Sequence, residues 1–212
     1  MLYNNYDNLI IKCVPDYEKI LKLLVEHIPK KSKKILDLGV GTGNIESYIF
    51  KKFPQVTIEG LDISSHLLKI AKEKHKKFQF IPIKGDIRES YFKKKKYDCV
   101  ISSLTIHHME DNEKIKIFSN IFSALKKEGI FINFDMVMPE KSNLDKMREK
   151  LFLRMKKQGL SAKFINMERQ EMKERDKLAK IKIQKNWLKE TGFSYRVLYK
   201  KGLFSVYACK KI

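Results

Sequence analysis

The chain is poor in the residue types that secreted and fibrous proteins depend on. Its 212 residues include only three cysteines, five prolines and nine glycines. Cys13, Cys99 and Cys209 are odd in number and lack paired spacing, which argues against a disulfide framework or a cysteine zinc site. We therefore expect free thiols in a reducing cytosol. No repeat or low-complexity linker interrupts the chain, so we expect one domain spanning residues 1–212.

Long hydrophobic runs are also missing. No segment approaches the roughly 18 consecutive apolar residues that a membrane-spanning helix needs. The N-terminal residues MLYNNYDNLIIKCVPDY do not have a basic region followed by an apolar region, as a signal peptide would. These absences favour a cytoplasmic protein that does not enter a membrane.

Arginine is scarce in a chain that is otherwise strongly basic. The formal net charge is +20, which by itself suggests nucleic acid as a partner. Only six of the 45 basic residues are arginine, however, and arginine is the preferred reader of phosphates and bases. We interpret the lysines as a solvated surface. A face that binds a polyanion such as tRNA remains the alternative.

What the sequence does contain is an alternation of strands and helices. The patterns predict helices over 16–28, 44–52, 64–76 and 112–127 and strands over 34–38, 56–61, 78–83, 97–104 and 130–137. Such an order implies right-handed crossovers and a parallel sheet. Residues 139–191 carry many charges and show helical spacing, with one apolar stripe over 144–155 and another over 178–188. Residues 194–211 indicate two strands around Lys201-Gly202.

A glycine-rich turn follows the first predicted strand in the stretch LDLGVGTGN. Gly39, Gly41 and Gly43 stand where ligands bind in parallel α/β sheets, at the carboxyl end of a strand. A dinucleotide fingerprint needs its third glycine at position 44, which is Asn44, and the Gly-Lys-Ser/Thr ending of a P-loop is absent. Asp37 before the turn would repel a pyrophosphate and attract an ammonium group. The turn therefore indicates a cationic ligand without phosphate.

Five segments in order carry a resemblance to a known family. They are LDLGVGTGN, EGLDIS, Gly85-Asp86-Ile87, YDCVISSLTIHHM and ALKKEGIFINFDMV. Together they resemble the class I S-adenosylmethionine-dependent methyltransferases. The resemblance implies an α/β, Rossmann-like, doubly wound sheet of seven strands, mostly parallel, with strand seven antiparallel. It also implies an N-terminal lid helix (1–30), a cofactor-binding core (31–138), a helical insertion or lid before strand six (139–191) and a closing hairpin (192–212).

The resemblance implies S-adenosylmethionine as cofactor and S-adenosylhomocysteine as product. Asp62 would bind the ribose hydroxyls, Ile63 would pack on the adenine, and Asp86 would meet the adenine amino group. The residues assigned to the cofactor in this way are Asp37, Gly39, Gly41, Gly43, Asp62, Ile63, Asp86, Ile87 and Ser103. Taken singly, the three aspartates also have simpler interpretations as turn, cap or strand-end residues.

Two adjacent histidines are the candidates for a catalytic base. His107 and His108 follow the fourth strand, where the acceptor meets the methyl group, and a histidine there could take a proton. The alternative is that one of them caps or packs the next helix. The fourth strand lacks the Asn/Asp-Pro-Pro-Tyr/Phe signature of nucleic-acid amino-methylating enzymes. Because the sulfonium already activates the methyl carbon, we expect no metal.

The N-terminal segment YDNLIIKCVPDYEKIL resembles the lid of a small-molecule branch of the family, the type 11, 12 and 25 methyltransferase domains. Tyr6 and Tyr17 would then cover the cofactor or substrate, although a helix packing on the sheet explains the segment as well. The same region is similar to carboxy-S-adenosylmethionine synthases, which need a cation for the extra carboxylate. Arg148, Arg154, Arg169 and Arg175 are the candidates.

The leading functional hypothesis is methyl transfer to an oxygen or nitrogen of a small-molecule acceptor by a monomer or homodimer. One alternative is a tRNA-modification enzyme, either an RNA methyltransferase or a carboxy-S-adenosylmethionine synthase. A NAD-binding oxidoreductase or a non-catalytic nucleotide-binding protein is disfavoured by Asn44 and Asp37.

Overall fold

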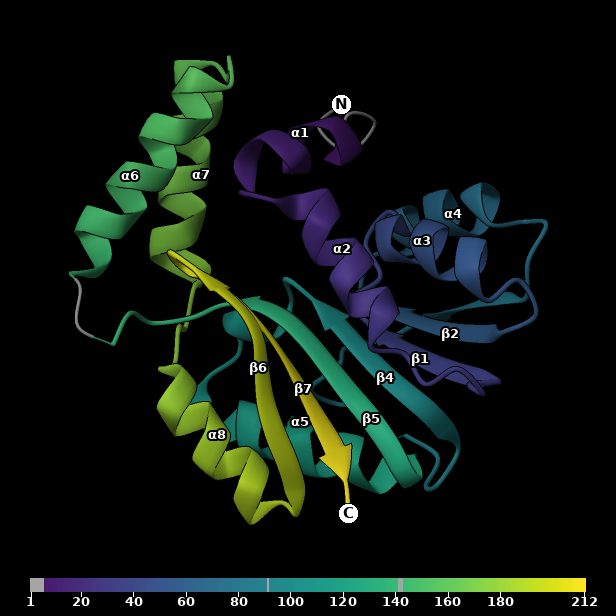
Figure 1. Cartoon of the computed structure of the whole chain (residues 1–212). Coiled ribbons are helices and arrows are strands. Elements are labelled where there is room, and N and C mark those ends of the chain that lie inside the picture. The colour runs from purple at the N-terminus through teal and green to yellow at the C-terminus, as the bar shows by residue number, and fades with distance from the viewer. Residues whose placement is uncertain (1–5, 91, 141–142) are drawn as a thin grey trace.

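A single twisted sheet organises the chain, of which the computed structural model describes residues 6–90, 92–140 and 143–212 (Figure 1). The strand order is β3-β2-β1-β4-β5-β7-β6. The strands are β1 (Lys34–Leu38), β2 (Thr57–Asp62), β3 (Phe80–Lys84), β4 (Tyr97–Ser103), β5 (Leu125–Met136), β6 (Phe193–Lys201) and β7 (Phe204–Lys211). β7 pairs antiparallel with both β5 and β6, and the other pairs are parallel. The expected seven-stranded, Rossmann-like α/β fold is confirmed.

Helices cover both faces of this sheet. They are α1 (Tyr6–Cys13), α2 (Tyr17–Glu26), α3 (Asn44–Lys52), α4 (Ser65–Lys74), α5 (Asp111–Ala124), α6 (Leu144–Lys157), α7 (Ala162–Arg175) and α8 (Ile181–Glu190), with a short 3-10 turn η2 (Ile106–His108). Buried side chains of α2, α3 and α4 form one core layer with the sheet, and those of α5 and α8 form the other. Among the described residues, no helix combines the length and hydropathy needed to cross a membrane.

The helical insertion lies at the edge of the sheet where β4 and β5 end. Figure 1 shows α6 and α7 as a hairpin standing beside α1. In α7 only Ile165 and Met172 are buried. Such sparse burial leaves no apolar stripe in the sequence, which is why the pattern indicated helices around residues 144–155 and 178–188 but did not resolve α7.

The largest difference from a predicted helix boundary is at the end of α5. The helix predicted over 112–127 ends at Ala124, because Leu125 adopts an extended conformation and pairs with Tyr97 of β4. Leu125 is fully buried, so its burial against β4 outweighs the helical spacing around it. The register between β4 and β5 then shifts between Tyr97 and Cys99. The three cysteines are all free and buried, as expected for thiols.

Candidate active site

The glycine turn between β1 and α3 needs glycine for two separate physical reasons. Gly39, Gly41 and Gly43 have φ angles of +81°, +57° and +77°, in the left-handed region that side chains disfavour. A Cβ on Gly39 would also lie 2.1 Å from Oγ1 of Thr105, whereas one on Gly41 would meet no atom within 4 Å. The turn therefore packs tightly against the β4–α5 loop at Gly39 and stays open at Gly41.

Two buried acids lie beneath the turn. Asp37 of β1 and Glu46 of α3 are almost inaccessible to solvent, and none of their carboxyl oxygens has a hydrogen-bond partner among the described residues. Burial, reinforced by the charge of Asp62, raises the pKa of Asp37 to about 6. Burial and the neighbouring Asp37 raise the pKa of Glu46 well above its ordinary value. The unpaired buried carboxylate of Asp37 suits a cationic ligand nearby, whereas the stronger shift keeps Glu46 in its neutral form.

Asp62 links the end of β2 to the glycine turn. One carboxylate oxygen accepts a hydrogen bond from the backbone N–H of Gly41 at 2.8 Å, and the other accepts one from Ser64 at 2.8 Å. Asp62 lines a cavity of about 440 Å³ together with Gly39, and the 63% exposed side chain of Ile63 stands at its wall. In this arrangement the carboxylate of Asp62 can bind ribose hydroxyls, and the apolar side chain of Ile63 can cover an adenine.

Asp86 lines the same cavity but is already held by a cation. Nε of Arg88 donates to both carboxylate oxygens of Asp86, at 2.9 and 3.0 Å, and the backbone N–H of Arg88 donates as well. These interactions hold the pKa of Asp86 below its ordinary value. An adenine amino group at this carboxylate therefore competes with Arg88.

We expect the Arg88→Ala variant to bind cofactor slightly more tightly, by no more than about threefold, because an exposed ion pair contributes little and its loss frees Asp86. Isothermal titration calorimetry measures this change. Asp86→Ala is the control and is expected to weaken binding about tenfold through loss of a charged hydrogen-bond acceptor. A large loss of affinity in Arg88→Ala would instead show that Arg88 itself contacts the ligand.

The structure gathers most of the residues assigned to the cofactor, but not all of them. Those that line the cavity are Gly39, Asp62, Ile63, Asp86 and Ile87, joined by His108. Asp37, Gly41, Gly43 and Ser103 are not among its lining residues. Thr105, Met109, Arg175 and Lys177 also line it, although no sequence motif predicts a cofactor role for them. Contact of Asp37 with the ligand's ammonium stays a prediction.

A second cavity of about 340 Å³ lies between α1, α6, α7 and the ends of β4 and β5. Its walls are mainly apolar and include Leu9, Ile10, Leu104, Met136, Met155, Phe164 and Phe204. Tyr6 lines it, and burial, aided by the charge of Glu168, raises the pKa of Tyr6 to about 12. Tyr17, the other expected lid residue, is buried with its ring 6.4 Å from that of Phe134 and lines neither cavity.

The two histidines after β4 differ in their surroundings. His107 is buried, and its Nδ1 lies 2.5 Å from Oδ1 of Asp135 in β5. Burial opposes its charge, but Asp135 and Asp176 together raise the pKa of His107. His108 lines both cavities, and burial and repulsion from His107 lower its pKa to about 4. We call the cavity of about 440 Å³ the cofactor cavity, after the residues assigned to the cofactor that line it; it shares His108 with the second cavity.

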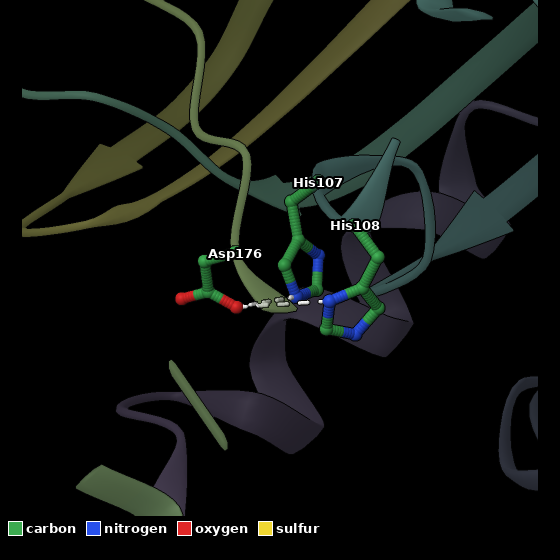
Figure 2. Close-up of side chains that lie close together, drawn as sticks. All are labelled: His107, His108 and Asp176. Atoms are coloured by element: carbon green, nitrogen blue, oxygen red, sulfur yellow. Dashed lines mark ion pairs between the residues drawn. The ribbon is translucent and has the colours of Figure 1, made fainter. Parts of the chain in front are cut away.

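Asp176 joins this pair from the far end of the insertion (Figure 2). Its Oδ1 lies 3.7 Å from Nε2 of His107 and 3.7 Å from Nδ1 of His108. Its Oδ2 lies 3.4 Å from the guanidinium of Arg148. No sequence motif predicts a role for Asp176. The residues that flank it in sequence do not indicate that it lies beside His107 and His108 in the fold.

The remaining arginines of the insertion bind elsewhere. Arg154 donates to the backbone carbonyl of Lys12, and Arg169 pairs with Glu149. Of the four candidate arginines, Arg175 alone is among the described residues that line the cofactor cavity.

Comparison with known proteins agrees with this geometry. Residues 35–129 match the family model for a methyltransferase domain. The chain is 26% identical to a carboxy-S-adenosyl-L-methionine synthase of Nautilia profundicola, with 89% of this chain and 82% of that enzyme covered. A synthase of the same name from a Nitratiruptor species is 30% identical, with 74% and 67% covered.

The fold has solved counterparts. An S-adenosylmethionine-dependent methyltransferase from Mesorhizobium loti superposes with a TM-score of 0.68 at 14% identity, with 93% of this chain and 98% of that chain covered. Among the described residues, the buried unpaired Asp37, the open glycine turn and Asp62 suit the ammonium and ribose of S-adenosylmethionine. The chain is an enzyme that uses this cofactor, and it belongs to the class I S-adenosylmethionine-dependent methyltransferases.

Proposed function

We propose that this enzyme transfers the methyl group of S-adenosylmethionine to an oxygen or nitrogen of a small, mainly apolar acceptor. The observation that supports this most directly is that the cofactor cavity and the apolar cavity share His108. An acceptor in the apolar cavity would meet the cofactor there. Holding the two reactants in line and excluding water are the main contributions a protein makes to such a displacement.

The charge of the apolar cavity favours some acceptors over others. The described residues that line it include Glu168, Glu171 and Asp176, and none is a lysine or arginine. An anionic acceptor would therefore be repelled, whereas a neutral or protonated amine or a neutral alcohol or phenol would be accepted. Where the acceptor has a proton to lose, His108 is the histidine placed nearest to both ligands.

A carboxy-S-adenosylmethionine synthase is the second candidate, and a specific feature favours it. Two of the relatives carry that name, and Arg175 and Lys177 line the cofactor cavity, where a cation could hold a carboxylate. The net charge of +20 is the one feature that supports a tRNA partner. The acidic lining of the apolar cavity weighs against an anionic substrate and places this candidate second.

A turnover experiment tests the proposal. Purified enzyme is incubated with S-adenosylmethionine and a panel of apolar amines, phenols and carboxylic acids, and mass spectrometry follows the cofactor. We expect S-adenosylhomocysteine to form with amines or phenols and not with the acids. Turnover confined to carboxylic acids would overturn the choice of a neutral or cationic acceptor, and a carboxylated cofactor in the purified protein would overturn the proposal in favour of the second candidate.

The His108→Gln variant tests the assignment of the shared residue. We expect turnover to fall at least about tenfold, because the group placed at both ligands is lost, while cofactor affinity stays within about threefold. His27→Gln, a change on α2 outside both cavities, is the matched control and should retain full turnover. Unchanged turnover in His108→Gln would remove the residue from the reaction.

A further inference from the structure

We propose that His107, His108 and Asp176 form a binding site for one divalent transition-metal ion, with zinc as the ion that their geometry suits best. Nε2 of His107, Nδ1 of His108 and a carboxylate oxygen of Asp176 all lie within 4.8 Å of one another. Figure 2 shows the two rings and the carboxylate converging on one point from two different segments of the chain. Two imidazoles and one carboxylate are a donor set typical of catalytic zinc.

The distances between the donor atoms are close to those of a loaded site. Each histidine nitrogen lies 3.7 Å from Oδ1 of Asp176. Donor atoms about 2.1 Å from a tetrahedral ion lie about 3.4 Å from one another. The separation of 3.7 Å is too long for a hydrogen bond, so the three groups face one another without bonding directly. The two separations from Asp176 are therefore about 0.3 Å longer than in a loaded tetrahedral site, and all three donor atoms lie within 4.8 Å of one another.

Neighbouring side chains already orient two of the three metal-binding residues, His107 and Asp176. Asp135 binds Nδ1 of His107, which leaves Nε2 to face the centre of the cluster. Such a carboxylate–histidine pair is the usual support of a metal-binding imidazole. Arg148 holds Oδ2 of Asp176 and leaves Oδ1 free. The side chains of Asp135 and Asp176 are only 3% and 2% exposed, so solvent does not compete for them.

The backbone fixes the two segments relative to each other. The N–H of Lys177 donates to the carbonyl of His107 at 2.8 Å, and Nζ of Lys114 binds the carbonyl of Lys177. These bonds hold the end of α7 against η2 without using any donor atom of the cluster. The geometry of the three donors is therefore built into the fold.

The site opens toward the acceptor. His107, His108 and Asp176 all line the apolar cavity of about 340 Å³. Three protein donors leave a fourth position of a tetrahedral ion for a molecule in that cavity. The consequence for catalysis rests on the proposed function: the ion would bind the acceptor's heteroatom, and His108 would hold the ion instead of taking a proton. Metal binding itself does not rest on it.

The test measures binding without any turnover. Protein stripped with a chelator is titrated with Zn²⁺ by calorimetry and with Co²⁺ by visible absorption, which reports tetrahedral coordination. We expect one equivalent of Zn²⁺ and the intense absorption of tetrahedral Co²⁺. Asp176→Asn should weaken Zn²⁺ binding at least about 100-fold, and Asp135→Asn, which weakens the support of His107 and removes no donor to the ion, about 10–100-fold. His66→Gln, an exposed histidine outside both cavities, is the control and should not change binding.

Three results would overturn the metal site: no Zn²⁺ binding to the wild type, an octahedral Co²⁺ spectrum, or equal affinity in Asp176→Asn and wild type. The wild-type spectrum decides the matter even if a variant does not fold. Failure of the proposed function has a different signature. If Zn²⁺ binds as expected and no acceptor yields S-adenosylhomocysteine, the proposed methyl transfer is wrong, but the metal site is confirmed. If turnover occurs in stripped protein, the metal site loses its catalytic role.

Discussion

Replacing Gly39 by alanine is expected to weaken S-adenosylmethionine binding by more than about 100-fold. The new Cβ would lie 2.1 Å from Oγ1 and 2.6 Å from Cγ2 of Thr105, so Thr105 must move. Thr105 lines the cofactor cavity, and its displacement would deform the wall on which the ligand rests. The left-handed φ of +81° adds about 1–2 kcal/mol of backbone strain. Calorimetric titration with the cofactor measures the loss.

Gly159→Ala separates the strain from the clash. Gly159 lies after α6 with a φ of +78°, nearly that of Gly39, but a Cβ there would meet no atom within 4 Å. This control should lose similar backbone stability while its cofactor affinity stays within about threefold. Circular dichroism shows whether each variant is folded. If folded Gly39→Ala bound the cofactor as tightly as Gly159→Ala does, the glycine turn would not be the cofactor site.

The Asp37→Asn variant should be more stable than the wild type at neutral pH, by up to about 3 kcal/mol, and should bind the cofactor more weakly. Burial raises the pKa of Asp37 from 3.8 to about 6, so the folded state holds the proton more tightly than the unfolded state does. A difference of this size corresponds to about 3 kcal/mol against folding once the group is ionised in both states. Asparagine keeps the size of the side chain and carries no charge.

The pH dependence of this effect has a definite sign. Below about pH 4 the carboxyl is protonated in both states, so wild type and Asp37→Asn should be equally stable. Between about pH 4 and pH 6 the unfolded state ionises first, and the wild type loses stability as the pH rises. Above about pH 6 the difference is constant. Urea unfolding at pH 4, 5, 6 and 8 measures it, and a gap that shrinks with rising pH would contradict the assignment.

Cofactor binding should change in the opposite direction to stability. Removing the negative charge beneath the turn is expected to weaken binding of the cationic cofactor about tenfold. Glu46→Gln is the matched control, because it alters the neighbouring buried acid and leaves Asp37 in place. We expect its affinity to stay within about threefold of the wild type. A loss in both variants would mean that packing, not the charge of Asp37, supports the cofactor.

The sequence by itself determined the fold and the cofactor. Apolar strands alternating with amphipathic helices specify a parallel sheet, because each pattern is a local consequence of which side chains are buried. The turn at Gly39, Gly41 and Gly43 is local in its positive φ angles, whereas the close contact of Gly39 with Thr105 comes from a distant part of the chain. Asp62 could be assigned from its distance along the chain, because the ends of adjacent parallel strands lie together.

The tertiary structure alone decided which side chains gather around His107 and His108. Asp176 lies far from His107 and His108 in sequence, and α7, which brings it back, buries too few side chains to be visible as a pattern. Asp135 faces His107 only because β5 pairs with β4 in one register. Contacts of this kind depend on how separate elements pack, and no local rule encodes them. The glycine turn and the family resemblance therefore indicate the cofactor from the sequence, while the apolar cavity and its histidine–aspartate cluster exist only once α1, α6 and α7 have packed beside the sheet.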